Sequence, residues 1–289
     1  MKKIFKNRIS MICAICLIIC MVSGFASAEV TSSSDIEKNE YEAVPMYING
    51  IKMSDGFKVE DSTYIPLRTF FDAIGEQTDI AWNGETNTAT ITSEDLDMVA
   101  AVGNNYIVVN DRCFYLPYSV LNVEGAIAMP VRELAKIFQV EVTWDEENES
   151  VSIAADDPKI LEKAETVYNE QDLYWLARLI NAEAGNQPLE GKIGVGNVVI
   201  NRVADPTCPK TIYGVIFDSK YGVQFSVTQT GGIYEEPNEE SIVAAKICLE
   251  GYNIVGDSIY FVNPDVGVSS WFANTRTFIS TIGDHDFYA

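Results

Sequence analysis

The chain contains two copies of one sequence pattern, and this internal repeat is the feature that most restricts its fold. Residues 63–91 read TYIPLRTFFDAIGEQTDIAWNGETNTATI, and residues 127–153 read IAMPVRELAKIFQVEVTWDEENESVSI. Each copy predicts a short helix that begins after a proline, followed by two strands around a turn. Alternating apolar runs at 46–53 and 106–116 predict additional strands. The first half of the chain is therefore expected to be an α+β repeat module.

The paired Pro-Leu/Val-Arg and Trp-Asn/Asp motifs of the two copies resemble the copper amine oxidase N-terminal-like domain. The resemblance covers about residues 45–154 and implies an accessory or binding domain. We expect its prolines to begin helices, and Trp82 and Trp144 to pack in a core. Copper is not implied, because this region has no histidine and Cys113 alone cannot form a transition-metal site.

Residues 1–28 have the pattern of a secretory signal peptide. Four basic residues precede an apolar run at 9–22, and small residues at 26–28 form a cleavage site. An uncleaved membrane anchor is the weaker interpretation, because the apolar run is short for a membrane-spanning helix. We therefore expect a secreted mature chain that begins near Glu29 and makes no membrane contact after cleavage.

The chain is strongly acidic, with 42 Asp and Glu residues against 20 Lys and Arg residues and a net charge of −22. The signal segment holds four of the basic residues and no acidic one, so its removal would change the net charge to −26. This charge argues against nucleic acid as a partner. Outside the signal segment, Cys113, Cys208 and Cys248 allow one disulfide at most, and a Cys208–Cys248 pair is left open.

Polar and charged stretches at 29–44 and 155–169 predict linkers, which leaves residues 170–289 as a second domain. Its His285 is the only histidine of the chain, too few for a zinc hydrolase site. No nucleophile elbow, P-loop or dinucleotide fingerprint occurs. Cys208 lies in PTCPKT and Cys248 lies within an apolar helical stretch, so neither fits an activated nucleophile. We expect no metal and no cofactor, which leaves carboxylate chemistry.

Glu183 is the candidate for that chemistry. Residues 172–184, DLYWLARLINAEA, have helical spacing, and Leu176, Leu179 and Ile180 share the face of Glu183. Glu183 would extend this buried face in the last helical turn, where the helix dipole disfavours a negative charge. Both effects raise the pKa of a carboxyl group, as the general acid of a glycosidase requires. The alternative is a solvated residue at a helix end that Gly185 terminates.

Several short motifs follow one another in order along residues 171–288. They are WLARLINAEAGNQPLEGKIGVGNVVINRV, TIYGVIF, QFS, YFVNP, a tryptophan and IGDHDFY. Together they resemble the spore-cortex-lytic (SleB-type) cell-wall hydrolase family. The resemblance implies a mainly helical, lysozyme-like domain with short strands around a glycan cleft. It also implies a lytic transglycosylase that cleaves the β-1,4 bond between N-acetylmuramic acid and N-acetylglucosamine, with Glu183 as its catalytic acid/base. The implied partner is the peptidoglycan glycan strand, in the cell wall or in the spore cortex or coat during germination.

The same motifs supply six candidate substrate-binding residues: Gln224, Phe225, Tyr260, Asn263, Trp271 and His285. Gln224 could hydrogen-bond an acetamido group, while Tyr260, Asn263 and Trp271 could stack on sugars or bond them. For Phe225 and Trp271, core packing is an equal alternative. His285 either lines the cleft or holds a structural hydrogen bond. Arg202, on the helix after Glu183, is expected to anchor an internal acid.

The chain departs from the family pattern directly after Glu183. Family members often read GEARGE where residues 182–187 read AEAGNQ, so Asn186 and Gln187 leave out a possible second acid and leave the contacts of a neighbouring subsite open. Three alternatives remain. The first is a hydrolytic N-acetylmuramidase that uses Asp205 or Asp218 as a second carboxylate. The others are a catalytically inactive wall- or spore-binding protein, and a wall enzyme that cleaves peptide bonds. The N-terminal domain could add a wall or spore-coat partner.

Overall fold

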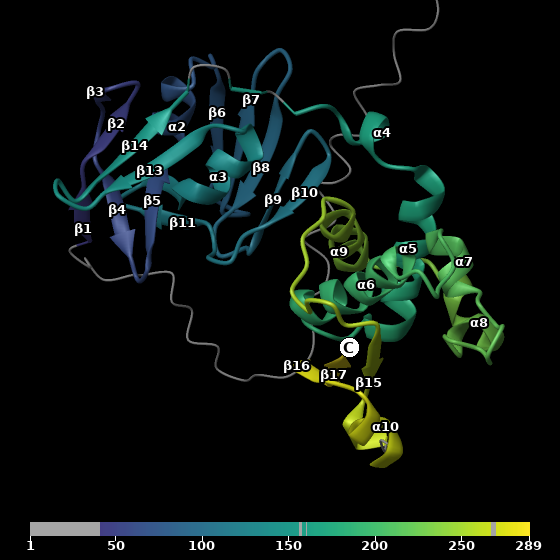
Figure 1. Ribbon diagram of the computed structural model, residues 1–289. Helices are drawn as coiled ribbons and strands as arrows, with labels where there is room; N and C mark the ends of the chain where they lie inside the picture. Colours follow the sequence, from purple (N-terminus) through teal and green to yellow (C-terminus); the bar gives the residue numbers. More distant parts are fainter. Residues whose placement is uncertain (1–40, 156–157, 160, 267–269) are drawn as a thin grey trace, which may run out of the picture. The chain divides into compact units, whose positions relative to one another are not determined.

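The computed structural model describes residues 41–155, 158–159, 161–266 and 270–289 (Figure 1). The predicted signal peptide and most of the first predicted linker lie outside these residues. The fold class is α+β, as predicted, with a β-rich N-terminal region and a mainly helical C-terminal region that carries short strands. Within the described ranges, no helix is long and apolar enough to cross a membrane.

The N-terminal region consists of three sheets, in which only β14 and β2 run parallel. The first sheet has the order β1 (Glu42–Val44), β4 (Gly56–Val59), β5 (Ser62–Pro66), β12 (Ala126–Pro130) and β11 (Leu121–Val123). The second has the order β10 (Arg112–Tyr115), β9 (Tyr106–Val109), β8 (Asp97–Ala101), β7 (Thr88–Thr92) and β6 (Asp79–Asn83). The third has the order β13 (Glu141–Asp145), β14 (Ser150–Ala154), β2 (Met46–Ile48) and β3 (Ile51–Lys52).

The internal repeat is confirmed element by element. Helix α2 (Leu67–Ala73) begins after Pro66 and helix α3 (Val131–Phe138) begins after Pro130. The β6–β7 hairpin follows the first helix and the β13–β14 hairpin follows the second. Proline suits this position because its fixed φ fits a helix start and the helix needs no N–H there. Phenylalanines 70, 71 and 138 of the two helices pack with ring centroids 5.4–5.6 Å apart.

The prediction that Trp82 and Trp144 pack in a core is wrong. Trp82 is 45% exposed and Trp144 is 41% exposed. Each lies on an edge strand, because β6 ends the second sheet and β13 ends the third. The apolar residues of the adjacent inner strands, such as Ile91 and Ile153, fill the core instead.

The C-terminal region is built on three helices, α5 (Glu170–Ala184), α6 (Leu189–Ala204) and α9 (Glu239–Leu249), which pack pairwise against one another. Shorter helical segments surround them: α7 (Ile212–Ile216), α8 (Val227–Thr230), η2 (Gly232–Tyr234), η3 (Pro264–Val266) and α10 (Ser270–Thr275). A small antiparallel sheet has the order β15 (Tyr260–Val262), β17 (His285–Tyr288) and β16 (Phe278–Ile282). The second predicted linker contains one helical turn, α4 (Ala164–Val167).

Two glycines let α6 approach its neighbours closely. A Cβ atom on Gly196 would lie 2.9 Å from the Ile180 side chain of α5 and 2.6 Å from the Cys248 sulfur of α9. A Cβ atom on Gly194 would lie 2.6 Å from the ring of Phe287 on β17. The space beside α6 is therefore already filled, and these contacts fix the position of α5, which carries Glu183.

Candidate active site

Glu183 lies in the last turn of α5, as predicted. Leu176, Leu179 and Ile180 on the same face are 0% exposed, and Glu183 itself is half-buried. Burial alone raises the pKa of the Glu183 carboxyl, with no contribution from a neighbouring acid. Among the described residues, no side chain pairs with this carboxylate. Gly185 is the C-cap of this helix, with a right-handed φ of −59°, but Glu183 is half-buried and so differs from the solvated residue of the alternative.

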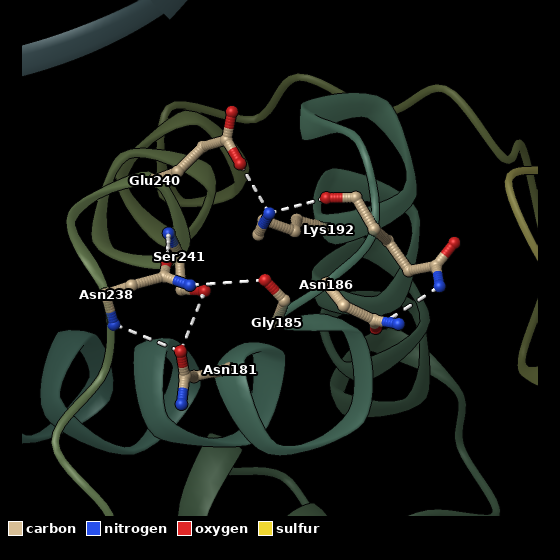
Figure 2. Close-up of polar contacts among 8 residues, drawn as sticks. Asn181, Gly185, Asn186, Lys192, Asn238, Glu240 and Ser241 are labelled. Atoms are coloured by element: carbon tan, nitrogen blue, oxygen red, sulfur yellow. Dashed lines mark hydrogen bonds and ion pairs between the residues drawn. The ribbon is translucent and has the colours of Figure 1, made fainter. Parts of the chain in front are cut away.

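The N-terminus of α9 braces the end of α5 (Figure 2). The Asn238 side chain caps α9 by accepting a hydrogen bond from the Ser241 N–H at 2.8 Å. Its backbone N–H donates to Asn181 Oδ1 at 3.0 Å, and its side-chain amide donates to the Gly185 carbonyl at 3.2 Å. One residue therefore satisfies polar groups on both sides of Glu183. The sequence signals this cap, since Asn precedes Glu-Glu-Ser at a helix start, but we did not predict its contacts with α5.

A buried lysine holds the loop that follows Glu183. Lys192 is 2% exposed, and its ammonium donates to the Gln187 carbonyl at 2.5 Å and pairs with the Glu240 carboxylate (Figure 2). A buried charge needs such partners to offset its desolvation. We did not predict this role of Lys192, because helical spacing alone does not show that a lysine is buried.

Gln187, one of the departures from the family pattern, connects this loop to the β16–β17 turn. The side-chain N–H of Gln187 donates a hydrogen bond to Asp284 Oδ2 at 2.9 Å. The side-chain oxygen, Oε1, accepts one from the Asp284 backbone N–H at 2.9 Å. A glutamate at position 187 would lack the N–H group that the Asp284 carboxylate accepts. The turn that precedes His285 is therefore joined to the segment directly after Glu183.

Four of the six candidate substrate-binding residues lie together around Arg202 and Phe261. The Arg202 guanidinium donates to Gln224 Oε1 at 3.3 Å and lies 5.2 Å from the ring centroid of Phe225 and 5.4 Å from that of Tyr260. The Phe261 ring lies 6.3 Å from Phe225 and 5.2 Å from His285. Of this group, Arg202, Gln224 and Tyr260 line a small hollow of about 60 Å³.

Within this group, Gln224 is exposed, Tyr260 is partly exposed, and Phe225 and His285 are buried. Phe225 belongs to the hydrophobic core that also contains the buried face of α5. Burial lowers the pKa of the His285 imidazole, so it is neutral near pH 7. Its Nδ1 atom is buried without a hydrogen-bond partner among the described residues.

Asn263 makes a local contact instead. The Asn263 side chain accepts a hydrogen bond from the Asp265 N–H at 2.9 Å, in the turn that leads into η3. Trp271 is placed on α10, but its side chain lies outside the described part of the structure.

The expectation that Arg202 anchors an internal acid is wrong. Its Nε donates to the Ile259 carbonyl at 2.7 Å, and its remaining contacts given above are with an amide and two aromatic rings. Four neutral groups thus surround this buried guanidinium, and the spacing of residues along the local sequence does not reveal these partners.

The cysteines do not pair, which closes the question of a Cys208–Cys248 disulfide. Cys113, Cys208 and Cys248 are free thiols. Cys248 is buried between α6 and α9, and burial raises the pKa of its thiol. Among the described residues, no group of three or more histidine, cysteine and acidic side chains could hold a metal ion.

Comparison with known families identifies two matched regions of the chain. The family described as "Cell Wall Hydrolase" matches residues 186–288, a range that begins three residues after Glu183. The description "Copper amine oxidase N-terminal domain" matches residues 47–153.

Several curated and solved proteins are similar to the C-terminal region. The spore cortex-lytic enzymes of Oceanobacillus iheyensis and Bacillus cereus are each 33% identical over 120 residues, which are 42% of this chain and 42% and 45% of those proteins. The chain thus matches less than half the length of these relatives. The solved catalytic domain of the germination-specific lytic transglycosylase SleB from Bacillus anthracis is 33% identical, over 42% of this chain and 97% of that chain, with a TM-score of 0.39.

The cell wall hydrolase CwlJ of Oceanobacillus iheyensis is matched over most of its length. It is 30% identical over 129 residues, which are 42% of this chain and 89% of that protein. With the family description that covers residues 186–288, this match shows that the chain belongs to the cell wall hydrolase family.

Proposed function

We propose that this chain degrades peptidoglycan as a lytic transglycosylase that cleaves the β-1,4 bond between N-acetylmuramic acid and N-acetylglucosamine, with Glu183 as its acid/base. The observation that carries the proposal is the half-buried Glu183 carboxyl, whose pKa is raised by burial with no contribution from another acid. The relatives described as spore cortex-lytic enzymes support the cortex as substrate, and we propose that the chain acts there during germination.

The proposed reaction needs one carboxyl group, because the substrate supplies the nucleophile. Protonated Glu183 donates its proton to the glycosidic oxygen as the C1–O4 bond breaks. The resulting carboxylate takes the proton from the C6 hydroxyl of the same muramic acid as the O6–C1 bond forms. Glu183 regains its proton, no water is consumed, and the product ends in a 1,6-anhydro sugar. A carboxyl group with a raised pKa suits both steps.

Hydrolysis by two carboxylates is the second candidate, and the surroundings of Glu183 disfavour it. Ordinary glycosidases place two carboxyl groups about 5–9.5 Å apart. Asp205 instead accepts hydrogen bonds from the backbone N–H and the hydroxyl of Thr207, which lower the pKa of its carboxyl. Asp218 accepts from the Lys220 N–H. Neither contributes to the pKa shift of Glu183.

In the proposed complex, the exposed side chains of the Arg202 cluster contact the sugars beside the cleaved bond. Gln224 and Tyr260 offer amide and phenol groups for this role, with Asn263 and Trp271 as further candidates from the following segment. Phe225 and the neutral His285 would support this surface from beneath, since both are buried. We also propose that the signal peptide directs the chain to the wall or cortex, where the N-terminal domain binds a wall or coat component.

Muropeptide analysis tests the proposal. Purified peptidoglycan and spore cortex are digested with residues 29–289, with the Glu183→Gln variant, and with Asp205→Asn as a matched acid-to-amide control. We expect anhydro-muropeptides by mass spectrometry from the parent and from Asp205→Asn, and none from Glu183→Gln. Reducing muramic ends would instead support the hydrolase, and products lost in Asp205→Asn would identify its second carboxylate. No glycan product would favour a binding protein. Cleaved peptide bonds, lost with chelators or thiol reagents, would favour a peptidase.

A further inference from the structure

Four aromatic side chains form an exposed patch on the C-terminal region. Tyr174 and Trp175 lie on α5, Tyr213 on α7 and Tyr234 on η2. The three tyrosines are 46%, 51% and 61% exposed, in that order. Clusters of exposed aromatic rings on one surface are uncommon and mark interaction sites. We call these four residues the aromatic patch.

The patch is held in place by contacts among its own rings. The Trp175 ring centroid lies 5.4 Å from Tyr213, 6.2 Å from Tyr234 and 5.0 Å from Tyr174. Phe217 supports it, at 5.1 Å from Trp175 and 4.6 Å from Tyr213. The rings therefore keep a fixed arrangement while the tyrosines remain open to solvent, and a ligand would pay little to order them.

At the edge of the patch, the positive charge of Arg178 is paired with a carboxylate. The Arg178 guanidinium lies 3.9 Å from the Tyr174 ring centroid and pairs with the Glu236 carboxylate at 2.5 Å. The patch therefore offers ring faces and tyrosine hydroxyls without a net charge of its own. Such a surface suits a neutral ligand that has both C–H faces and hydroxyl groups.

The patch reaches the end of α5 through η2, which carries Tyr234. Tyr174 precedes Glu183 by nine residues on α5, so the two side chains project from opposite sides of the helix, about 14 Å apart along its axis. At the other side, η2 packs against the end of α5: a Cβ atom on Gly232 would lie 3.9 Å from the Cβ of Ala182, the residue before Glu183. A polymer bound at Glu183 would therefore reach the patch past Ala182 and η2.

We propose that the aromatic patch binds the glycan strand of peptidoglycan at sugars beyond the cleaved bond. This inference rests on the proposed function, because it assigns an extended strand to the same site. Pyranose rings present apolar C–H faces that pack on aromatic rings, and their hydroxyl and acetamido groups pair with tyrosine hydroxyls. The patch thus favours long strands over short fragments.

Binding to insoluble peptidoglycan tests this inference without turnover. The Glu183→Gln chain is compared with the same chain carrying Tyr213→Ala and Tyr234→Ala, and with one carrying Tyr221→Ala. Tyr221 is a matched control, because it is 82% exposed and lies outside the patch. We expect the double tyrosine change to weaken binding about tenfold, as the loss of two ring contacts predicts, and Tyr221→Ala to leave it unchanged. Thermal unfolding verifies that all three chains are folded.

A conservative pair of changes and a second readout sharpen the test. Tyr213→Phe with Tyr234→Phe keeps both rings and is expected to retain most of the binding. With Glu183 intact, the alanine pair is expected to lower the turnover of long strands relative to short glycan fragments. Equal binding by parent and alanine pair, or an equal loss in Tyr221→Ala, would overturn the inference. So would a parent dimer in sedimentation that the alanine pair abolishes, because the patch would then bind a second copy. Anhydro products from the parent would leave the proposed function standing in each of these cases.

Discussion

The two ends of helix α5 use their side chains in opposite ways. Its first half presents Tyr174 and Trp175 on a surface where rings contact one another and the tyrosine remains open to solvent. Its last turn buries a carboxyl group beside Leu179 and Ile180 and leaves it without a charged partner. The first arrangement suits binding, because ring faces are accessible. The second suits proton transfer, because burial holds a proton on an acid that water would ionise.

The largest expected effect is at the buried end. Glu183→Gln keeps the size of the side chain and removes the transferable proton. We expect turnover of peptidoglycan to fall about 100- to 10,000-fold, the usual contribution of general acid–base catalysis. Binding to insoluble peptidoglycan should be retained. A variant that keeps turnover within a few-fold of the parent would contradict the role of Glu183.

The next largest expected effect is the pH dependence that Glu183, in the last turn of α5, gives to turnover and stability. Because the pKa of Glu183 lies above its ordinary value near 4.5, turnover should fall as pH rises through this raised pKa, where the proton is lost. The folded chain also holds this proton to higher pH than the unfolded chain does. Unfolding free energy should therefore decrease as pH rises from about 4.5 through the raised pKa.

Two measurements verify this sign. Chemical unfolding at a series of pH values should show the decrease in the parent and a smaller decrease in Glu183→Gln. Initial rates at the same pH values should show the alkaline fall in the parent, unaltered by Tyr213→Ala. A parent whose stability rises through this window relative to Glu183→Gln would mean that the pKa of Glu183 is lowered instead.

The loop after Glu183 offers a smaller effect on stability. Gln187→Glu replaces the amide that donates to Asp284 with a second carboxylate. We expect a loss of about 1–2 kcal/mol in unfolding free energy at pH 7, from the missing hydrogen bond and the repulsion. Adding Asp284→Asn restores a donor and should recover most of the loss in a double-mutant cycle. Strictly additive effects of the two changes would show that the pair does not act as a unit.

The smallest expected effect is at the exposed end. Tyr213→Ala alone removes one ring of the aromatic patch, and we expect binding of Glu183→Gln chains to peptidoglycan to weaken about three- to fivefold. A loss as large as that of the alanine pair would mean that the two rings do not contribute separately. Pull-down at a series of chain concentrations measures the difference.

Local periodicity predicted the buried stripe of α5, the position of Glu183 on it and the repeated proline-started helices, because each depends on neighbours in sequence. It did not predict contacts between distant residues. Gln187 and Asp284 are 97 residues apart, and Asn238 and Asn181 are 57 apart. The partners of Arg202 also come from later segments of the chain. The exposure of Trp82 and Trp144 depends on which strands lie at a sheet edge. The family motifs identified Gln224, Phe225, Tyr260 and His285 as candidates. That these residues surround Arg202 and Phe261 could be seen only in the fold.

The central claim is that Glu183 transfers the proton twice and the substrate supplies the nucleophile. The most direct test is digestion of peptidoglycan in water enriched in oxygen-18, with mass spectrometry of the new muramic ends. We expect anhydro ends that contain no oxygen-18, because no water enters the reaction. Reducing muramic ends that carry one oxygen-18 atom would contradict it, since water would then be the nucleophile.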